Sequence, residues 1–242
     1  KKIRIDISWL SLLKLEPILD EIVLYEPNLD IEKTKNNKFT IGGISIDTKQ
    51  NSNASNWILN QDEIIIIDGK VKWQDHSRDS QPLIIDNISA IYESSATLSN
   101  FDRHIFNIKG ELSNLNGQIV NLSGYFDADS IDKISKPDGQ INLSVNKFDI
   151  NAFRPWLDYP VEIISANGNI DIRCNFKNGQ ITYIDSKLDV KDFITKINQA
   201  HEEPLTLKEF EGQISYINKK NIASINISKV NVVTDNGINI DE

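Results

Sequence analysis

Side chains that could perform acid/base or metal chemistry are few in this sequence, and only one group of them clusters. Trp73-Gln74-Asp75-His76 is followed closely by Asp79. Neighbouring residues of a strand point to opposite faces of a sheet, so these side chains would converge on a ligand only if a loop folded them back. We interpret the cluster as the polar end of a hairpin. A metal site, or a polysaccharide-active site built from Trp73, Asp75 and Asp79, is the alternative.

The remaining titratable candidates are isolated from one another. Asp127 and Asp129 could share a strand face, where a carboxylate pair can raise one pKa for proton transfer. Their surroundings resemble a strand end entering a loop, so acid/base chemistry is not favoured there. His104 is expected to be a half-buried strand residue, and His201 falls in an acidic loop without a partner. We therefore assign no catalytic residue, no metal site and no cofactor.

Cys174 is the only cysteine, which excludes an internal disulfide and a zinc site built from cysteines. It lies between Ile172 and Phe176 in a segment where apolar and polar residues alternate. On the apolar face of a strand, a thiol behaves as a small hydrophobic side chain with a raised pKa. We expect Cys174 to be unreactive while the domain is folded.

The charge balance of the chain excludes further classes of function. Its 242 residues contain 26 Lys and Arg against 35 Asp and Glu, a net charge of −9 at pH 7. This surplus of negative charge argues against binding nucleic acid through its phosphates and against a basic membrane-surface patch. The longest wholly apolar run, Ile64 to Ile67, is far shorter than the roughly 20 residues that cross a bilayer. Any membrane anchor is expected to lie outside this sequence.

Apolar and polar residues alternate strictly in several segments, and this alternation places all the apolar side chains of a strand on one face. A sheet with one apolar and one polar face is typical of antiparallel strands. We predict an all-β protein with a long, mostly antiparallel sheet. The side chains that we expect to line its apolar face are Ile141, Leu143, Val145, Ile170, Ile172, Cys174, Phe176, Ile225 and Ile227.

Residue pairs that tolerate positive φ mark the expected hairpin turns. These pairs are Asn116-Gly117, Asp138-Gly139, Asn167-Gly168, Asn178-Gly179 and Asn236-Gly237. Asp68-Gly69 fits a bulge or a bend as well as a turn. Helical signals are short, and we expect helix only within residues 8–17, 54–60, 150–157 and 192–199.

So little helix leaves the apolar face of the sheet without an obvious cover. The sheet could close on itself as a sandwich or as a barrel. It could also curl into a U-shaped trough that stays open along one side. An aliphatic lining needs no directional hydrogen bonds, so a trough would suit acyl chains, with each buried methylene contributing about 0.8 kcal/mol.

Several motifs, taken in their order along the chain, resemble the YhdP branch of the AsmA-like proteins. The segments that carry the resemblance are Trp9-Leu10-Ser11-Leu12-Leu13, Tyr25-Glu26-Pro27-Asn28-Leu29, Trp57-Ile58-Leu59-Asn60-Gln61, Ile65 to Asp75, Arg78, Pro82-Leu83, Phe153-Arg154-Pro155-Trp156-Leu157 and Phe210 to Tyr216. Together they span nearly the whole chain. Their order, more than any single motif, carries the resemblance.

The resemblance implies a curved sheet, the β-taco, which forms a long hydrophobic groove with a few short helices. The family it points to includes TamB and is related to the bridge-like lipid-transfer proteins. It implies a non-enzymic conduit that carries glycerophospholipid between the inner and outer membranes of Gram-negative bacteria. Residues 1–242 would then form one continuous groove segment of a longer periplasmic protein.

By the same resemblance, that longer protein would be anchored in the inner membrane by a segment outside this sequence. Its far end, also outside this sequence, would meet the outer membrane or proteins in it. The alternative is a structural or adhesin-like periplasmic β-domain, in which the apolar face is a closed core. The two differ in whether the apolar face is sealed or open enough to hold lipid.

Overall fold

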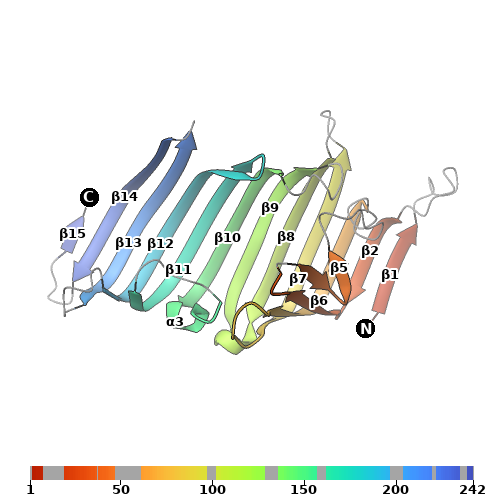
Figure 1. Cartoon of the computed structure of the whole chain (residues 1–242), viewed down its shortest axis with the longest axis horizontal. Helices are drawn as coiled ribbons and strands as arrows, with labels where there is room; N and C mark the ends of the chain where they lie inside the picture. Colours follow the sequence, from red (N-terminus) through yellow and green to blue (C-terminus); the bar gives the residue numbers. More distant parts are fainter. Residues whose placement is uncertain are drawn as a thin grey trace.

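The computed structural model describes residues 2–7, 19–36, 38–46, 61–96, 102–128, 136–156, 162–196, 204–219, 222–234 and 239–241. Within these residues the chain forms a single sheet of 15 strands, whose order follows the long axis of the molecule (Figure 1). The prediction of an all-β protein is confirmed.

The strands are β1 (Lys2–Ile7), β2 (Leu19–Tyr25), β3 (Asn28–Lys33), β4 (Phe39–Ile41), β5 (Ile44–Ile46), β6 (Glu63–Asp75), β7 (Leu83–Ala96), β8 (Asp102–Leu112), β9 (Gln118–Ala128), β10 (Asp138–Asp149), β11 (Glu162–Lys177), β12 (Gln180–Lys196), β13 (Leu205–Lys219), β14 (Ile222–Thr234) and β15 (Asn239–Asp241). The described helical segments are a 3₁₀ turn, η1 (Ser113–Leu115), and the short helix α3 (Ile150–Phe153).

The pairing is a meander, with one exception near the N-terminus. From β6 to β15 every strand pairs antiparallel with the next strand in the chain. β2 and β3 instead run parallel to β6, β2 along its first half and β3 along its second half. β1 then pairs antiparallel with β2, and β4 with β3. The expectation of a mostly antiparallel sheet is confirmed.

Most long strands bend at one level of the sheet, where the backbone adopts a left-handed conformation. Five non-glycine residues with φ between 51° and 57° lie inside strands there: Asp68, Asn87, Lys147, Asp192 and Lys229. Register shifts accompany all five, in β6, β7, β10, β12 and β14. A bulge adds an unpaired residue and bends its strand. Together, these bulges form a crease across the sheet.

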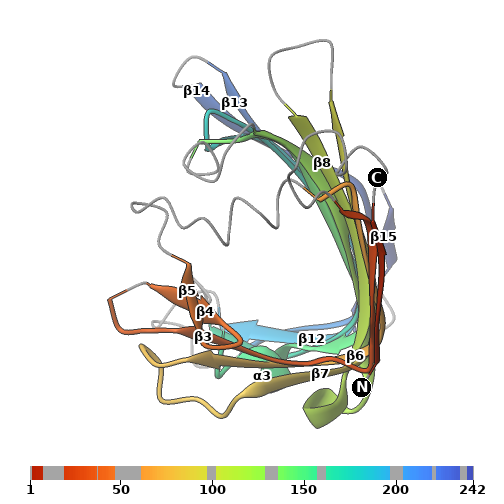
Figure 2. The ribbon, with the colours of Figure 1, turned by 90° about the vertical axis from the view of Figure 1, so that its right-hand side faces the viewer.

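The crease divides the sheet into an upright wall and a lower wall (Figure 2). The lower wall includes β3 and the parts of β6, β7, β10, β12 and β14 that lie beyond their bulges on the same side of the crease. At the crease the backbones come close together. A Cβ on Gly168 of β11 would lie 1.9 Å from the carbonyl oxygen of Asp189 in β12. Only glycine fits this position.

The apolar face of the sheet is its concave face. A buried cluster around Val145, Ala166 and Val190 includes Phe148, and Leu143, Ile163, Ile170 and Phe193 pack against it. Some of these side chains come from the upright wall and others from the lower wall. Side chains on the two sides of a bend meet only on the inside of that bend. The sheet is an open curved layer (Figure 2). The packed apolar cluster therefore lies on its concave side.

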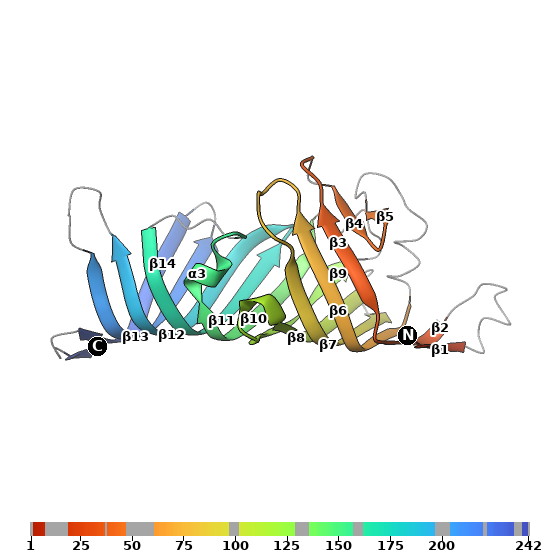
Figure 3. The ribbon, with the colours of Figure 1, turned by 90° about the horizontal axis from the view of Figure 1, so that it is seen from below.

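α3 sits on the lower side of the sheet, next to β10 and β11 (Figure 3). Asp149 caps it, because its Oδ1 accepts a hydrogen bond from the backbone N–H of Asn151 at 2.9 Å. The helix expected within residues 150–157 is confirmed as this short element. In the part of the chain that the structure describes, no helix is long and apolar enough to cross a membrane.

Three local expectations are wrong. Asp138-Gly139 begins β10 instead of forming a turn, and Asn167-Gly168 lies at the crease of β11. β12 continues through Lys196, so residues 192–196 are strand instead of helix, and Asp192 is a bulge residue. Asn116-Gly117 and Asn178-Gly179 do form turns. The helices expected at 8–17 and 54–60 and the turn at Asn236-Gly237 lie outside the described residues.

Candidate functional site

Two uninterrupted rows of side chains cross the concave face from β1 to β14. Residues paired directly across neighbouring strands share a face, so the register alone defines each row. The first row is Ile5, Ile22, Ile64, Tyr92, Phe106, Gly124, Ile141, Cys174, Ile184, Tyr216 and Ile225. The second row is Ile3, Leu24, Ile66, Ala90, Ile108, Leu122, Leu143, Ile172, Ser186, Ile214 and Ile227.

The rows contain almost no polar group that needs a partner. Ser186 is the one hydroxyl side chain of the second row, and its Oγ donates to the carbonyl of Ile214 at 3.0 Å. A surface whose polar atoms are already bonded offers a ligand contact area but no directional hydrogen bonds. Such a surface suits hydrocarbon.

All nine residues predicted to line the apolar face lie on this one face. Ile141, Leu143 and Val145 of β10 pair with Cys174, Ile172 and Ile170 of β11, and Phe176 pairs with Gly139. Ile225 and Ile227 lie at the far end of the two rows, on β14. Their exposed fractions are 67% and 60%, whereas Val145 at the crease retains 9%. The face is thus sealed at the crease and open towards its end.

Phenylalanine rings lie flat over glycines on the concave face. The Cζ of Phe106 is 3.0 Å from the position of a Cβ on Gly124, and that of Phe176 is 2.8 Å from one on Gly139. In both pairs the two residues are direct cross-strand partners. A side chain at the glycine would push the ring away from the sheet. These pairs therefore keep the rings close to the sheet backbone and the apolar surface flat.

Sequence reasoning missed a large part of these rows, including Tyr92, Phe106, Ile184 and Tyr216. β7 and β12 contain polar residues on both faces, so their alternation is weak. The cross-strand register supplies the missing information, and a single sequence does not contain it.

His104 is a buried structural residue on the concave face. Its exposed fraction is 2%, lower than the half-burial that the sequence predicted. With Nε2 protonated, it donates to the carbonyl of Ala128 at 2.8 Å and accepts at Nδ1 from the hydroxyl of Tyr92 at 2.7 Å. Burial raises the pKa of Tyr92 to about 12. Both ring nitrogens are occupied, so His104 is not placed to act as a base.

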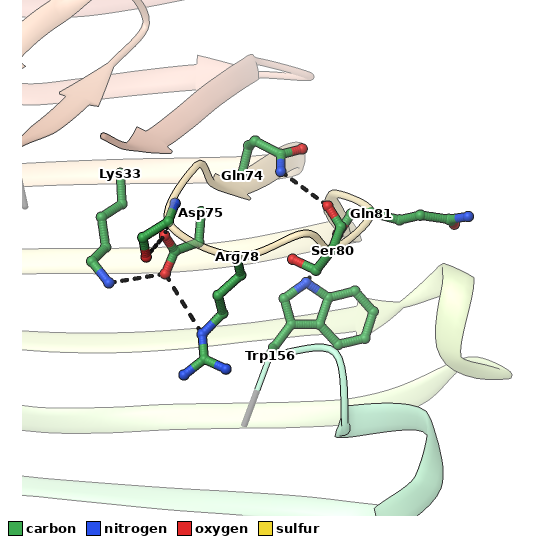
Figure 4. Close-up of polar contacts among 8 residues, drawn as sticks. Lys33, Gln74, Asp75, Arg78, Ser80, Gln81 and Trp156 are labelled. Atoms are coloured by element: carbon green, nitrogen blue, oxygen red, sulfur yellow. Dashed lines mark hydrogen bonds and ion pairs between the residues drawn. The ribbon is translucent and has the colours of Figure 1, made fainter. Parts of the chain in front are cut away.

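The cluster at Trp73 to His76 is the polar end of the hairpin between β6 and β7, as predicted. Asp75 is buried, and its carboxylate accepts from Lys33 Nζ at 2.9 Å and from the hydroxyl and the backbone N–H of Ser77 at 2.5 and 2.9 Å. The hydrogen bonds from Ser77 and Lys33 lower the pKa of Asp75 to about 2. Arg78 lies 3.9 Å from the same carboxylate (Figure 4).

Trp156 ties this hairpin to the segment after α3. Its indole Nε1 donates to the backbone carbonyl of Gln81 at 3.0 Å (Figure 4). Gln74 donates to the carbonyl of Ser80 within the hairpin. Asp75 and Trp156 thus stabilise the rim of the lower wall. Their polar groups are occupied by these contacts within the protein. This arrangement gives no support to a polysaccharide-active site at Trp73, Asp75 and Asp79.

The remaining titratable candidates also have structural partners or fall outside the described residues. Asp127 forms a two-bond ion pair with Arg103, at 2.8 and 2.9 Å. Burial raises the pKa of Cys174, as the sequence predicted. Asp129 and His201 lie outside the described residues. Among those described, no three His, Cys, Asp or Glu side chains are grouped as a metal would require.

One comparison with known proteins identifies the chain. Residues 1–241 match the model of the family described as YhdP protein. No curated protein and no solved structure matches the chain. The match covers the same segments that resemble this family in the sequence, and the open curved sheet agrees with it. The chain belongs to the YhdP family, a family of AsmA-like envelope proteins with a role in lipid transport.

Proposed function

We propose that this chain is a non-enzymic segment of a lipid conduit, which carries the acyl chains of glycerophospholipids along its concave face. The polar headgroups remain in water at the open side of the sheet. Residues 1–242 act as one continuous segment of a longer periplasmic protein anchored in the inner membrane. That protein moves lipid between the inner membrane and the outer membrane.

The two apolar rows on the concave face carry this proposal. They cross eleven strands, and strands lie about 4.8 Å apart, so the path is roughly 48 Å long. The hydrocarbon core of a whole bilayer is only about 30 Å thick. A complete acyl chain can therefore lie along the rows without leaving apolar surface.

The energetics favour movement along the rows over tight binding at one place. Each methylene removed from water contributes about 0.8 kcal/mol wherever it lies on an aliphatic surface. Because the rows repeat Ile and Leu on most strands, an acyl chain gains similar energy at successive positions. The hydroxyl of Ser186 and the ring of His104 are already hydrogen-bonded within the protein, so neither leaves an unpaired polar atom against the acyl chain.

The partial exposure of the rows supports this function over that of a closed structural core. Ile141 lies in the middle of the first row and is 36% exposed. Core side chains of closed sandwiches lose nearly all contact with water. An adhesin-like β-domain would require a second layer over this face.

Site-specific photocrosslinking in living cells tests the proposal. A benzophenone amino acid replaces Leu143 on the concave face, and in the matched control it replaces the adjacent Ser144, which points to the convex face. We expect phospholipid adducts at position 143 and none at position 144, measured by mass spectrometry of the purified protein. Equal yields at the two positions, or protein adducts alone at position 143, would support the structural alternative.

A further inference from the structure

The convex face of the sheet holds a polar depression opposite the apolar rows. It has a volume of about 290 Å³ and lies over β9 to β12. Two register rows cross it: Asn142 with Arg173 and Asp185, and Ser144 with Asp171 and Lys187. These residues alternate along their strands with Leu143 and Ile172, so they point away from the concave face.

The four charges of the depression alternate in sign. Asp171 faces Lys187 across the strand pair, and Arg173 faces Asp185. Along each strand the sign changes again two residues further on. Two positive and two negative groups cancel, so the depression has no net charge with which to hold a simple ion.

These charged side chains form only a few hydrogen bonds with other residues of the protein. Arg173 Nε donates to Asn142 Oδ1 across a long 3.4 Å, and Asp185 Oδ1 accepts from Gln213 Nε2 at 2.8 Å. Among the described residues, no ion pair joins the four charges to each other, although they are direct neighbours. Their remaining donors and acceptors face solvent at the depression.

We infer that this depression binds an uncharged glycan. A sugar hydroxyl donates and accepts at the same time, so vicinal hydroxyls match a surface on which strong donors and strong acceptors alternate. Hydrogen bonds to charged groups are the stronger kind, and they suit a ligand that has many hydroxyls and no charge. Tyr183 lies two residues before Asp185 on the same face of β12, where its half-buried ring can pack against a sugar.

This inference does not depend on the lipid function, because the two surfaces are on opposite faces of the sheet. A glycan held on the convex face leaves the concave face unobstructed. The same protein can therefore contact a polysaccharide of the envelope while its apolar face is occupied.

Titration of the 242-residue chain with neutral oligosaccharides tests the inference. The probes are chitotetraose and maltotetraose, and phosphoethanolamine and inorganic phosphate serve as charged competitors. Two-dimensional NMR spectra of the isotope-labelled protein measure the binding. We expect at least one oligosaccharide to bind with a dissociation constant in the millimolar range or below. The largest changes in chemical shift should occur at residues 142–144, 171–173 and 185–187.

Variants separate this site from the rest of the surface. Arg173→Ala and the isosteric Asp171→Asn should each weaken binding at least tenfold. Lys191→Ala removes a charge on the same face but outside the depression, so it should leave the affinity unchanged. If Arg173→Ala fails to fold, the affinity of Asp171→Asn alone tests the site. The inference is overturned if neither oligosaccharide binds at 10 mM, if both depression variants bind normally, or if only phosphoethanolamine or phosphate binds.

Discussion

Asp75 shows how one side chain fixes the rim of the sheet. Its pKa lies at about 2, below the ordinary value of 3.8, because Ser77 and Lys33 bond its ionised form. A group whose folded pKa is lowered stabilises the protein above its ordinary pKa, and that contribution is lost as the pH falls. The relevant range therefore runs from about pH 4 down to pH 2.

We expect Asp75→Asn to lower the melting temperature at pH 7, because Lys33 and Ser77 lose the carboxylate that they bond. The difference from the unsubstituted protein should shrink as the pH falls from 4 to 2, since the native Asp75 is then protonated as well. Thermal unfolding followed by circular dichroism measures both effects. Asp79→Asn, an exposed substitution in the same hairpin, should change neither. A constant difference across this range would contradict the role of the ionised carboxylate.

Cys174 tests the assignment of faces at single-residue resolution. Burial raises its pKa, so less thiolate is present near neutral pH than for a free cysteine. We expect a charged, membrane-impermeant thiol reagent to label the folded chain slowly and the urea-unfolded chain rapidly. Arg173→Cys in a Cys174→Ser background places the thiol on the convex face and should label rapidly while folded. Fast labelling of native Cys174 would reverse the register of β11, because a one-residue slip exchanges the two faces.

The face of a residue could be predicted from the sequence, but its depth and its partners could not. Strict alternation placed Cys174 and Leu143 on the apolar side. The burial of His104, however, depends on Tyr92 and Ala128, which are 12 and 24 residues away along the chain. Those contacts follow from strand register, which no local pattern states.

At the scale of elements, the crease explains two of the three wrong local predictions. The sequence predicts a hairpin tip at Asn167-Gly168 and the start of a helix at Asp192, because Asn and Gly tolerate positive φ and Asp often caps helices. The same residue types also form bulges inside long strands. What decides between a turn and a bulge is whether a partner strand continues on both sides, and β12 and β13 provide that continuation.

Lys147 offers a direct test of the crease. It adopts φ 57° near the end of β10, a conformation that costs a residue with a Cβ roughly 1 kcal/mol. Lys147→Gly should therefore leave the free energy of unfolding unchanged or raise it by up to about 1 kcal/mol. The neighbouring Asn146→Gly, in ordinary strand conformation, should lower it by about 1 kcal/mol. Urea unfolding measures both, and equal losses would argue against a bulge at Lys147.

At the scale of the whole molecule, the sequence predicted a sheet with one apolar face, but it did not predict whether the sheet closes on itself. A sandwich, a barrel and a trough share the same alternation, and they differ only in how the strands bend. Here five bulges bend β6, β7, β10, β12 and β14 at one level, and they leave the concave face open. That alignment depends on residues from Asp68 to Lys229, so it belongs to the assembled sheet and not to any one segment.

A charge on the concave face distinguishes an open conduit from a closed core. The variants are Leu143→Asp and Ile172→Asp, which are direct partners in the second row. Ser144→Asp is the control on the convex face. Introduced into the full-length protein in cells, the first two should reach near-normal abundance and yet fail to supply phospholipid to the outer membrane. Immunoblotting measures abundance, and the transfer of labelled phospholipid measures supply.

The reason lies in what surrounds the new carboxylate. In a closed core, an unpaired buried carboxylate costs several kcal/mol, a large part of the roughly 5–15 kcal/mol that keeps a domain folded. On an open face it reaches water or a lipid headgroup, so the cost in stability falls, while the path for acyl chains loses its continuous apolar surface. The two architectures therefore predict opposite orders of damage. Loss of both aspartate variants through misfolding, together with normal transport by Leu143→Ala, would show that the face is a sealed core.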